Sequence, residues 1–360
     1  MKHKFKYDWK LSDGYPAEGI EYHGSKVFSC FACGGGSTMG YKLSGFDVIG
    51  MNEIDKRMAD AYIENHNPKY SFIEPIQDFK NRENLPKELF DLDILDGSPP
   101  CSSFSMQGNR EDDWGKEKKF REGQSNQVLD TLFFDFLDLA ESLQPKVVIA
   151  ENVKGILFGK AKKYARNILL RFDTAGYYTS VFVLDASEMG VPQRRERVFF
   201  VGIRKDLSGK LPAENRKLFS DFPFLDLNFS EKEIPFEDID QGITDNYIYD
   251  LTPGHSKYYD KVPIGSKFSD LTGYGFTVYK IDPSKPLMTI LCEDKGRGGA
   301  IHHKQNRSLT IKELLNASSF PTDYIVKSET EAYRLCGMSV PPLMVAQISY
   351  RIFQQWLLNL

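Results

Sequence analysis

One cysteine of the chain stands in a setting that suits a nucleophile. Cys101 ends the segment Asp96-Gly-Ser-Pro-Pro-Cys101, directly after the apolar run 92–95. Because two prolines restrict the backbone, we expect a buried strand to deliver the thiol in a fixed direction. The residues after it, as far as Gly123, are typical of a mobile loop that closes over a substrate. On this segment alone, a small buried cysteine at a strand end is an equally good interpretation.

An acid and a group of arginines have the chemistry to act with this thiol. Glu151-Asn-Val153 follows the apolar run 145–150, and the carboxyl ends of parallel strands form the edge where such sheets bind ligands. In apolar surroundings this acid would hold and donate a proton near neutrality. Gln193-Arg-Arg-Glu-Arg197 opens another apolar strand, whose alternation places Arg195 and Arg197 on one face, where they can hold a carboxylate, a phosphate or a carbonyl oxygen. The alternatives are an exposed loop carboxylate and a surface ladder of ion pairs.

A glycine-rich turn predicts a nucleoside cofactor. Cys33-Gly-Gly-Gly-Ser-Thr-Met-Gly40 follows a predicted strand at 26–29, and glycines there let backbone N–H groups approach a ligand. Glu53, at the end of the next strand, is placed to accept hydrogen bonds from ribose hydroxyls. NAD and S-adenosylmethionine (SAM) both fit, although the turn lacks a strict GxGxxG pattern. Cys30-Phe-Ala-Cys33 also matches a CxxC redox pattern, but such a pair normally opens a helix.

The order of the elements indicates the fold class. Strand-like and helix-like segments alternate from Lys26 to Ile203, which predicts an α/β, doubly wound, mostly parallel sheet covered on both faces. The pattern breaks after Lys205. We therefore expect a catalytic domain at 1–205 and 326–360 and a second, smaller, irregular β-rich domain at 206–325. The predicted strands are 26–29, 47–51, 71–76, 92–95, 145–150, 178–184 and 197–203, the predicted long helices are 55–66, 128–143 and 161–175, and capping boxes are predicted at Thr310 and Ser328.

Composition and charge limit the class of protein. The chain has 360 residues, of which 41% are hydrophobic, enough for a large core. Its net charge of −4 gives no overall sign of nucleic-acid binding, although basic residues gather in 154–171 and 295–312, as on a solvated face or a phosphate-binding surface. The five cysteines are scattered without zinc-ligand spacing, so we expect a reducing cytoplasm, no disulfide framework and no metal. No secretion signal or membrane anchor is expected.

These residues together fit one reaction. C5 of cytosine is a poor nucleophile, but attack of a thiolate at C6, with a proton or hydrogen bond at N3, makes C5 able to accept a methyl group. Cys101 would supply the thiolate, Glu151 the contact to N3 and an arginine the contact to O2. A cytosine inside a duplex is out of their reach, so the base would have to be flipped out.

The chain resembles the DNA (cytosine-5) methyltransferases of bacterial or phage restriction–modification type, from about Lys26 to its C-terminus. The resemblance depends on the order and spacing of Phe31-Ala-Cys-Gly-Gly-Gly36, Asn52-Glu53, Pro99-Pro100-Cys101, Glu151-Asn-Val153, Gln193-Arg-Arg-Glu-Arg197, Arg307-Ser-Leu-Thr-Ile-Lys-Glu313 and Gly337-Met-Ser-Val-Pro-Pro342. It implies a class I, Rossmann-like SAM-dependent methyltransferase that acts on double-stranded DNA. The second domain would then be the target-recognition domain, which reads bases in the major groove.

The resemblance also implies a role for each site residue. Cys101 would be the covalent nucleophile, Glu151 would contact cytosine N3, Arg197 would contact O2 and orient Glu151, and Arg195 would support them. In the cofactor site, Phe31 would pack near the adenine, Glu53 would bind the ribose, Ile54 and Ile76 would line the pocket, and Leu132 and Ser339 would lie near the methionine end. The remaining residues expected in that site are Ala32, Gly34, Gly35, Gly36 and Pro99.

Some features of the sequence leave alternatives open. The usual family pattern has Asp, Gly, an acid and Asn at the positions occupied here by Ser29, Cys33, Pro75 and Met338. We expect these departures to affect SAM affinity more than the reaction. The alternative functions are an RNA cytosine-5 methyltransferase, a non-catalytic DNA-binding protein on this scaffold and an NAD-linked enzyme. We expect a monomer in the cytoplasm of a bacterium, with a cognate restriction endonuclease as functional partner or with a solitary, phage-protective role.

Overall fold

The chain forms two compact units, which are described separately. The computed structural model describes residues 3–100, 117–118, 127–128, 131–159, 161–217, 222–242, 250–273, 278–292 and 299–360. We call the first unit the sheet unit; it comprises Pro16–Leu184, Glu196–Asn228 and Ile348–Leu360. The second unit comprises Met1–Tyr15, Asp185–Arg195 and Phe229–Gln347. Cys101 and most of the loop predicted to follow it lie outside the described residues; β5 (Glu117–Lys118) lies within that loop and pairs antiparallel with β6 (Gln127–Val128).

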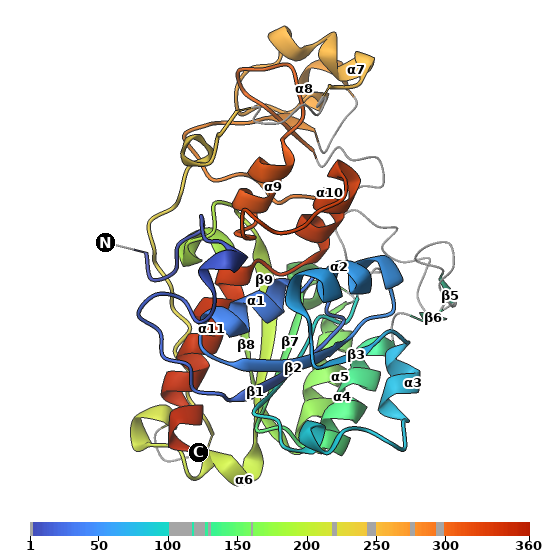
Figure 1. Ribbon diagram of the computed structural model, residues 1–360, viewed down its shortest axis with the longest axis vertical. Coiled ribbons are helices and arrows are strands. Elements are labelled where there is room, and N and C mark those ends of the chain that lie inside the picture. The colour runs from blue at the N-terminus through green and yellow to red at the C-terminus, as the bar shows by residue number, and fades with distance from the viewer. Residues whose placement is uncertain are drawn as a thin grey trace. The chain divides into compact units, whose positions relative to one another are not determined.

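The sheet unit is built on seven strands in the order β3-β2-β1-β4-β7-β9-β8 (Figure 1). Parallel pairing joins β3 to β2, β2 to β1, β1 to β4 and β4 to β7, whereas β9 runs antiparallel to β7. The bounds are β1 Lys26–Cys30, β2 Asp47–Asn52, β3 Tyr70–Phe72, β4 Ile94–Gly97, β7 Val147–Val153, β8 Tyr177–Asp185 and β9 Glu196–Arg204. The prediction of an α/β, mostly parallel sheet is confirmed.

Amphipathic helices cover this sheet and close its core. In α4 the apolar residues recur at helical spacing, and Leu132, Phe136 and Leu143 are all buried. They share one hydrophobic cluster with Phe28 of β1 and Phe200 of β9. Figure 1 shows α3, α4 and α5 packed together. The helix bounds are α1 Gly36–Leu43, α2 Lys56–His66, α3 Ile76–Lys80, α4 Leu132–Leu143, α5 Ala161–Thr174 and α6 Lys205–Ser208.

Several predicted element bounds are wrong in ways that matter for the site. Ile76 does not end a strand but begins α3, because Pro75 takes the N-cap position with its fixed φ of −57°. The fourth strand extends beyond 92–95, so that Asp96 lies inside β4. The fifth continues to Val153, so that Glu151 lies within β7 and not after it. The helix predicted to begin at 128 begins at Leu132.

The second unit is made of short elements. Its strands in the described part of the chain are β10 (Tyr279–Lys280) and β11 (Ala300–Ile301), which pair in parallel. Its main helices are α7 (Pro253–Ser256), α8 (Ser269–Thr272), α9 (Ile311–Ala317), α10 (Glu329–Met338) and the first part of α11 (Pro342–Gln355). The predicted domain bounds at 205 and 326 remain a prediction. They separate a catalytic from a target-recognition function, whereas the two units are defined by their internal contacts. No helix among the described residues is long and apolar enough to cross a membrane.

The helix starts of the second unit follow the predicted capping chemistry. At α9 the Glu313 N–H donates to Thr310 Oγ1 at 3.1 Å, and the Thr310 N–H donates to Glu313 Oε2 at 2.8 Å, which completes the capping box. At α10 Ser328 Oγ accepts from the Glu331 N–H at 3.2 Å. The Glu331 carboxylate, however, accepts from the Lys327 N–H instead of closing the box. The prediction is therefore confirmed at α9 and is half right at α10.

Candidate active site

The segment that leads to Cys101 is held at the carboxyl end of β4. Gly97 is needed there, because a Cβ on it would lie 2.5 Å from Cε2 of Phe136. The buried Pro99 carbonyl accepts a hydrogen bond from Asn152 Nδ2 at 3.0 Å. Asn152 belongs to β7, which pairs with β4. The side chain next to Glu151 thus fixes the backbone two residues before the predicted nucleophile.

Glu151 and Arg197 lie together, as expected from the sequence. Arg197 Nε is 3.0 Å from Glu151 Oε1, and both side chains are largely buried. The antiparallel register pairs Val153 with Arg197 and Glu151 with Phe199, so that the two charged residues are diagonal neighbours on one face of the sheet. Burial lowers the pKa of Arg197 from its usual value, and the Glu151 carboxylate opposes this shift. A paired, partly dehydrated carboxylate and guanidinium therefore face the same side of β7 and β9.

The other residues of the arginine motif have different roles. Arg195 belongs to the second unit, where its buried guanidinium donates from Nη2 to the carbonyl oxygens of Gly337 at 2.8 Å and Ser339 at 3.0 Å. Arg194 forms an exposed ion pair with Glu233. The surface ion-pair interpretation thus describes Arg194, whereas Arg195 holds buried backbone. Support of Arg197 by Arg195 remains a prediction.

The glycine-rich turn has an unusual backbone. Phe31 and Cys33 have φ values of 53° and 48°, which non-glycine residues rarely adopt, and Gly35 has a φ of 81°. A Cβ on Gly35 would lie 2.3 Å from Nε2 of His66, so only glycine fits. The usual family glycine would adopt this φ without strain, whereas Cys33 carries a side chain that disfavours it.

Glu53 is fixed against this turn. Its Oε2 accepts the Cys33 N–H at 2.8 Å, and its Oε1 accepts the Asp55 N–H at 2.8 Å. Burial raises the pKa of Glu53, while these backbone hydrogen bonds lower it. Each carboxylate oxygen can accept a further hydrogen bond, which a ribose diol can supply. The geometry of Glu53 thus suits the ribose contact expected from the sequence.

The remaining predicted cofactor residues differ in their surroundings. Phe31 and Ile54 are half-buried, and the Phe31 ring centroid is 6.4 Å from that of Phe136. Ile76 and Leu132 are buried members of the main core cluster. The residues Ala32, Gly34, Gly35 and Gly36 are buried in the turn and the start of α1. Ser339, in the second unit, has a buried hydroxyl with no hydrogen-bond partner among the described residues.

Sequence reasoning missed two polar residues beside the site. Asn152 was part of a motif but had no assigned contact. Asp96 was only the first residue of the cysteine segment, yet its carboxylate accepts hydrogen bonds from three hydroxyl groups. An acid in the middle of the otherwise apolar run of β4 is the signal that could have indicated it.

The CxxC redox interpretation gains no support from the structure. Cys30 and Cys33 are both buried and not joined by a disulfide. Burial raises the pKa of the Cys30 thiol well above its usual value. A redox pair needs a thiolate, so Cys30 is poorly placed for this chemistry.

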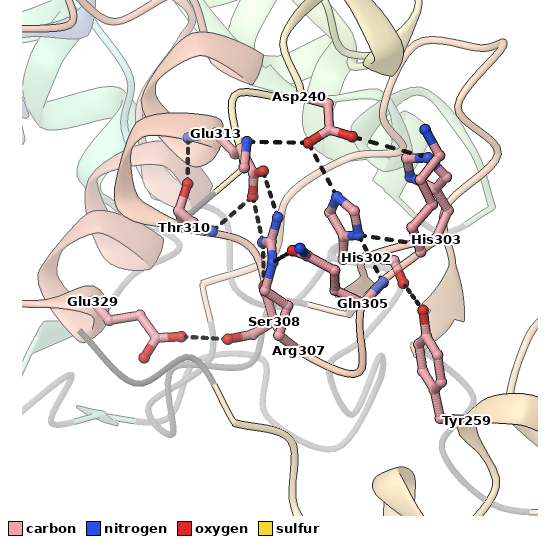
Figure 2. A network of polar contacts seen from close by, with 12 residues as sticks. Asp240, Tyr259, His302, His303, Gln305, Arg307, Ser308, Thr310, Glu313 and Glu329 are labelled. Carbon is pink, nitrogen blue, oxygen red and sulfur yellow. Dashed lines mark hydrogen bonds and ion pairs between the residues drawn. The ribbon is translucent and has the colours of Figure 1, made fainter. Parts of the chain in front are cut away.

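Three residues of the types that bind metals, the partly buried Asp240 and the buried His302 and His303, lie close together in the second unit (Figure 2). Asp240 Oδ1 is 3.1 Å from His302 Nε2, and Asp240 Oδ2 is 3.9 Å from His303 Nε2. His302 Nδ1, however, accepts the N–H groups of Lys304 and Gln305, both at 3.1 Å. The proton of this neutral ring is therefore on Nε2, where it is donated to Asp240. His302 thus offers no lone pair toward Asp240, and the cluster lacks a set of three metal ligands.

The chain is similar to known proteins along nearly its whole length. The family model of C-5 cytosine-specific DNA methylases matches residues 25–354. The Type II methyltransferase M.FnuDI of Fusobacterium nucleatum is 29% identical over 349 residues, which cover 91% of this chain and 94% of that protein. M.NgoPII of Neisseria gonorrhoeae is also 29% identical, over 92% of this chain and 96% of its own. A crystal structure of a Spodoptera frugiperda DNMT2 mutant has a TM-score of 0.64 at 18% identity, over 91% of this chain and 99% of its own, a likeness that shows the fold.

Proposed function

The chain belongs to the C-5 cytosine-specific DNA methylase family and is a DNA cytosine-5 methyltransferase, and from this premise we propose a mechanism for its site. The methyl group of SAM passes to C5 of a cytosine flipped out of double-stranded DNA. Cys101 is the nucleophile, Glu151 and Arg197 bind the base, and residues 206–325 read the target sequence.

The Glu151–Arg197 pair is the observation that carries this proposal. Arg197 uses Nε toward Glu151 and donates from Nη1 to the Glu196 carbonyl at 2.8 Å, so its Nη2 is the donor that would reach the cytosine O2. Glu151 holds a proton against N3 while Cys101 Sγ bonds to C6, so that the electrons of the C5–C6 double bond become available at C5. After methylation, a water molecule accepts the C5 proton, and the C5–H electron pair re-forms the C5–C6 double bond. The electron pair of the S–C6 bond returns to Cys101 as the thiolate, and the N3 proton returns to Glu151. Asn152 supports these steps by fixing the backbone at Pro99.

The residues of the glycine-rich turn suit SAM as the cofactor. When bound, SAM supplies a methyl group on a positively charged sulfur. Glu53 would accept its ribose hydroxyls, and the turn from Phe31 to Gly36 would lie against its adenosine. The contact of Ser339 with the methionine end remains a prediction, and its buried hydroxyl has no hydrogen-bond partner among the described residues.

A covalent trap tests this proposal. Duplex DNA with 5-fluorocytosine at the target cannot lose its C5 substituent, so the wild-type enzyme with SAM should form an adduct that survives denaturing electrophoresis. Cys101→Ala should bind the same duplex and form no adduct. Transfer of a tritiated methyl group to duplex DNA, with tRNA as the control substrate, measures the reaction itself. Adduct formation by Cys101→Ala, or transfer to tRNA alone, would contradict the proposal.

The biological role proposed here is protection of DNA in a restriction–modification system. The relatives carry the name Type II methyltransferase, and the similarity spans nearly the whole of each protein. We expect a monomer in the bacterial cytoplasm, with a cognate endonuclease as functional partner. DNA from an expressing host should resist one restriction enzyme whose site contains the methylated cytosine, and DNA cut by every enzyme of a broad panel would argue against protection.

A further inference from the structure

Asp96 is a buried carboxylate that the proposed mechanism does not use. Its Oδ2 accepts hydrogen bonds from Ser37 Oγ at 2.8 Å and Ser29 Oγ at 2.9 Å, and its Oδ1 accepts from Tyr41 OH at 3.1 Å. Asp96 is only 5% exposed to solvent. Within the described residues no ion pair neutralises it, so three hydroxyl groups are what stabilises a charge that would otherwise be costly to bury.

The three donors come from the elements on either side of the glycine-rich turn, and the acceptor comes from the strand that leads to the predicted nucleophile. Ser29 is on β1 and pairs in register with Asp96 on β4. Ser37 and Tyr41 lie one turn apart on α1, the helix that begins at the end of the glycine-rich turn. Asp96 itself stands just before the segment that leads through Pro99 to Cys101. One carboxylate therefore joins the start of the cofactor turn, the helix after it and the strand that delivers the nucleophile.

Stability alone does not explain this arrangement. Burial raises the pKa of Asp96 to about 6, and the negative charge of Glu151 adds to the shift. An apolar residue on β4 would avoid this cost, and its neighbours Ile94 and Leu95 are apolar and fully buried. What the carboxylate adds is direction, because three hydrogen bonds fix the relative position of three elements.

We propose that Asp96 is a positioning residue that sets the cofactor turn and the Cys101 segment in one geometry for methyl transfer. This inference rests on the proposed function. Ser29 is in register with Asp96, and its Oγ is also 3.4 Å from Ser37 Oγ. A carboxylate placed at position 29 would therefore reach Ser37 Oγ and a hydroxyl group placed at position 96. The exchange of the two side chains should preserve the network.

Four variants test the proposal: Asp96→Ser, Asp96→Asn, Ser29→Asp and the exchange Ser29→Asp/Asp96→Ser. Each is assayed for kcat and for the KM of SAM, for binding of S-adenosylhomocysteine by calorimetry and for its thermal midpoint. At a temperature well below its thermal midpoint, the Asp96→Ser variant should have a lower kcat and should bind S-adenosylhomocysteine about tenfold more weakly or worse. Ser29→Asp should also be impaired, because it places two carboxylates side by side. The exchange should recover kcat and binding to within about threefold of wild type.

The controls separate positioning from folding. A residue that is only structural would lower the thermal midpoint and leave kcat and S-adenosylhomocysteine affinity unchanged in the folded variants, and this result would overturn the proposal. If Asp96→Ser does not fold, the Asp96→Asn variant and the exchange variant test the proposal. An exchange variant that folds but regains neither activity nor S-adenosylhomocysteine binding would also overturn the proposal. Wild-type enzyme that transfers no methyl group to duplex DNA would instead refute the proposed function, and S-adenosylhomocysteine binding would still report on Asp96.

Discussion

Two buried carboxylates at the same edge of the sheet are stabilised in different ways. Glu151, at the junction of β7 and β9, lies 3.0 Å from the guanidinium of Arg197. Asp96, at the junction of β1, β4 and α1, has hydroxyl donors and no ion pair among the described residues. The difference separates their roles. A carboxylate paired with one guanidinium on one face of the sheet can still contact a substrate, whereas a carboxylate that accepts hydrogen bonds from three hydroxyl groups holds structural elements in place.

Loss of the acid at position 151 should have the largest effect. Glu151→Gln keeps the shape but removes the proton carrier, so kcat should fall about 10² to 10⁴-fold while the KM of SAM barely changes. Steady-state kinetics with duplex DNA measure both quantities. A wild-type rate would place the acid elsewhere, and a loss that appears only in the KM of SAM would assign Glu151 to the cofactor.

Disruption of the pair from the other side should lower stability as well as remove a contact to the base. Arg197→Met leaves Glu151 buried without a cation and should lower the free energy of unfolding by about 3 kcal/mol. The double variant Arg197→Met/Glu151→Gln removes both charges and should regain most of that loss. Denaturant unfolding of the three proteins measures this coupling, and strictly additive losses would show that the two groups do not interact.

Asp96 should give the sheet unit a distinct pH dependence. Its pKa is about 6 in the folded state and about 3.9 in the unfolded state, so the folded protein binds the proton more tightly. The contribution of protonated Asp96 to the free energy of unfolding is fully present below about pH 4. It is lost as the pH rises through about 6, which lowers the free energy of unfolding by about 3 kcal/mol. The Cys30 thiol and the Tyr41 hydroxyl stay protonated in this range because burial raises the pKa of each.

The comparison with Asp96→Asn isolates this contribution. The difference in unfolding free energy, wild type minus Asp96→Asn, should fall as the pH rises from about 4 to 7 and then stay constant. Urea unfolding at several pH values provides the data. A difference that is flat across this range, or rises with pH, would contradict a pKa of Asp96 that burial raises.

The smallest effects distinguish a buried hydrogen bond from an exposed ion pair. Asn152→Ala removes the donor to the Pro99 carbonyl and should cost about 1–2 kcal/mol in stability, with a lower kcat. Arg194→Ala removes the exposed pair with Glu233 and should cost about 0.5 kcal/mol or less. Equal effects of the two variants on kcat would mean that Asn152 does not position the cysteine segment.

Local patterns explain what the sequence could predict. The alternation of strands and helices is a short-range signal, so the sheet could be predicted from the residues alone. The capping box at Thr310 is equally local. The approach of Glu151 to Arg197 was expected only from the resemblance of their two motifs to those of the methyltransferase family. Pro75 was ambiguous, because a proline can end a strand or cap a helix, and Ile76 was misassigned for that reason.

The features that the sequence could not predict are contacts between residues far apart in the chain. The Asp96 network joins positions 29, 37 and 41 to position 96, and no spacing rule indicates that three hydroxyl groups converge on one acid. The bond from Asn152 to Pro99 depends on the pairing of β4 with β7. The hydrogen bonds of Arg195 to the carbonyl groups of Gly337 and Ser339 depend on residues more than a hundred positions away in the chain.

Bisulfite sequencing tests the central claim most directly. DNA would be taken from a host without cytosine methylation of its own that expresses either the wild-type protein or Cys101→Ala. The account predicts protected cytosines in one short recurring context with the wild type and none with the variant, which would also reveal the target site. Protection that persists with Cys101→Ala, or no protected cytosine with wild-type protein that is folded and binds S-adenosylhomocysteine, would contradict it.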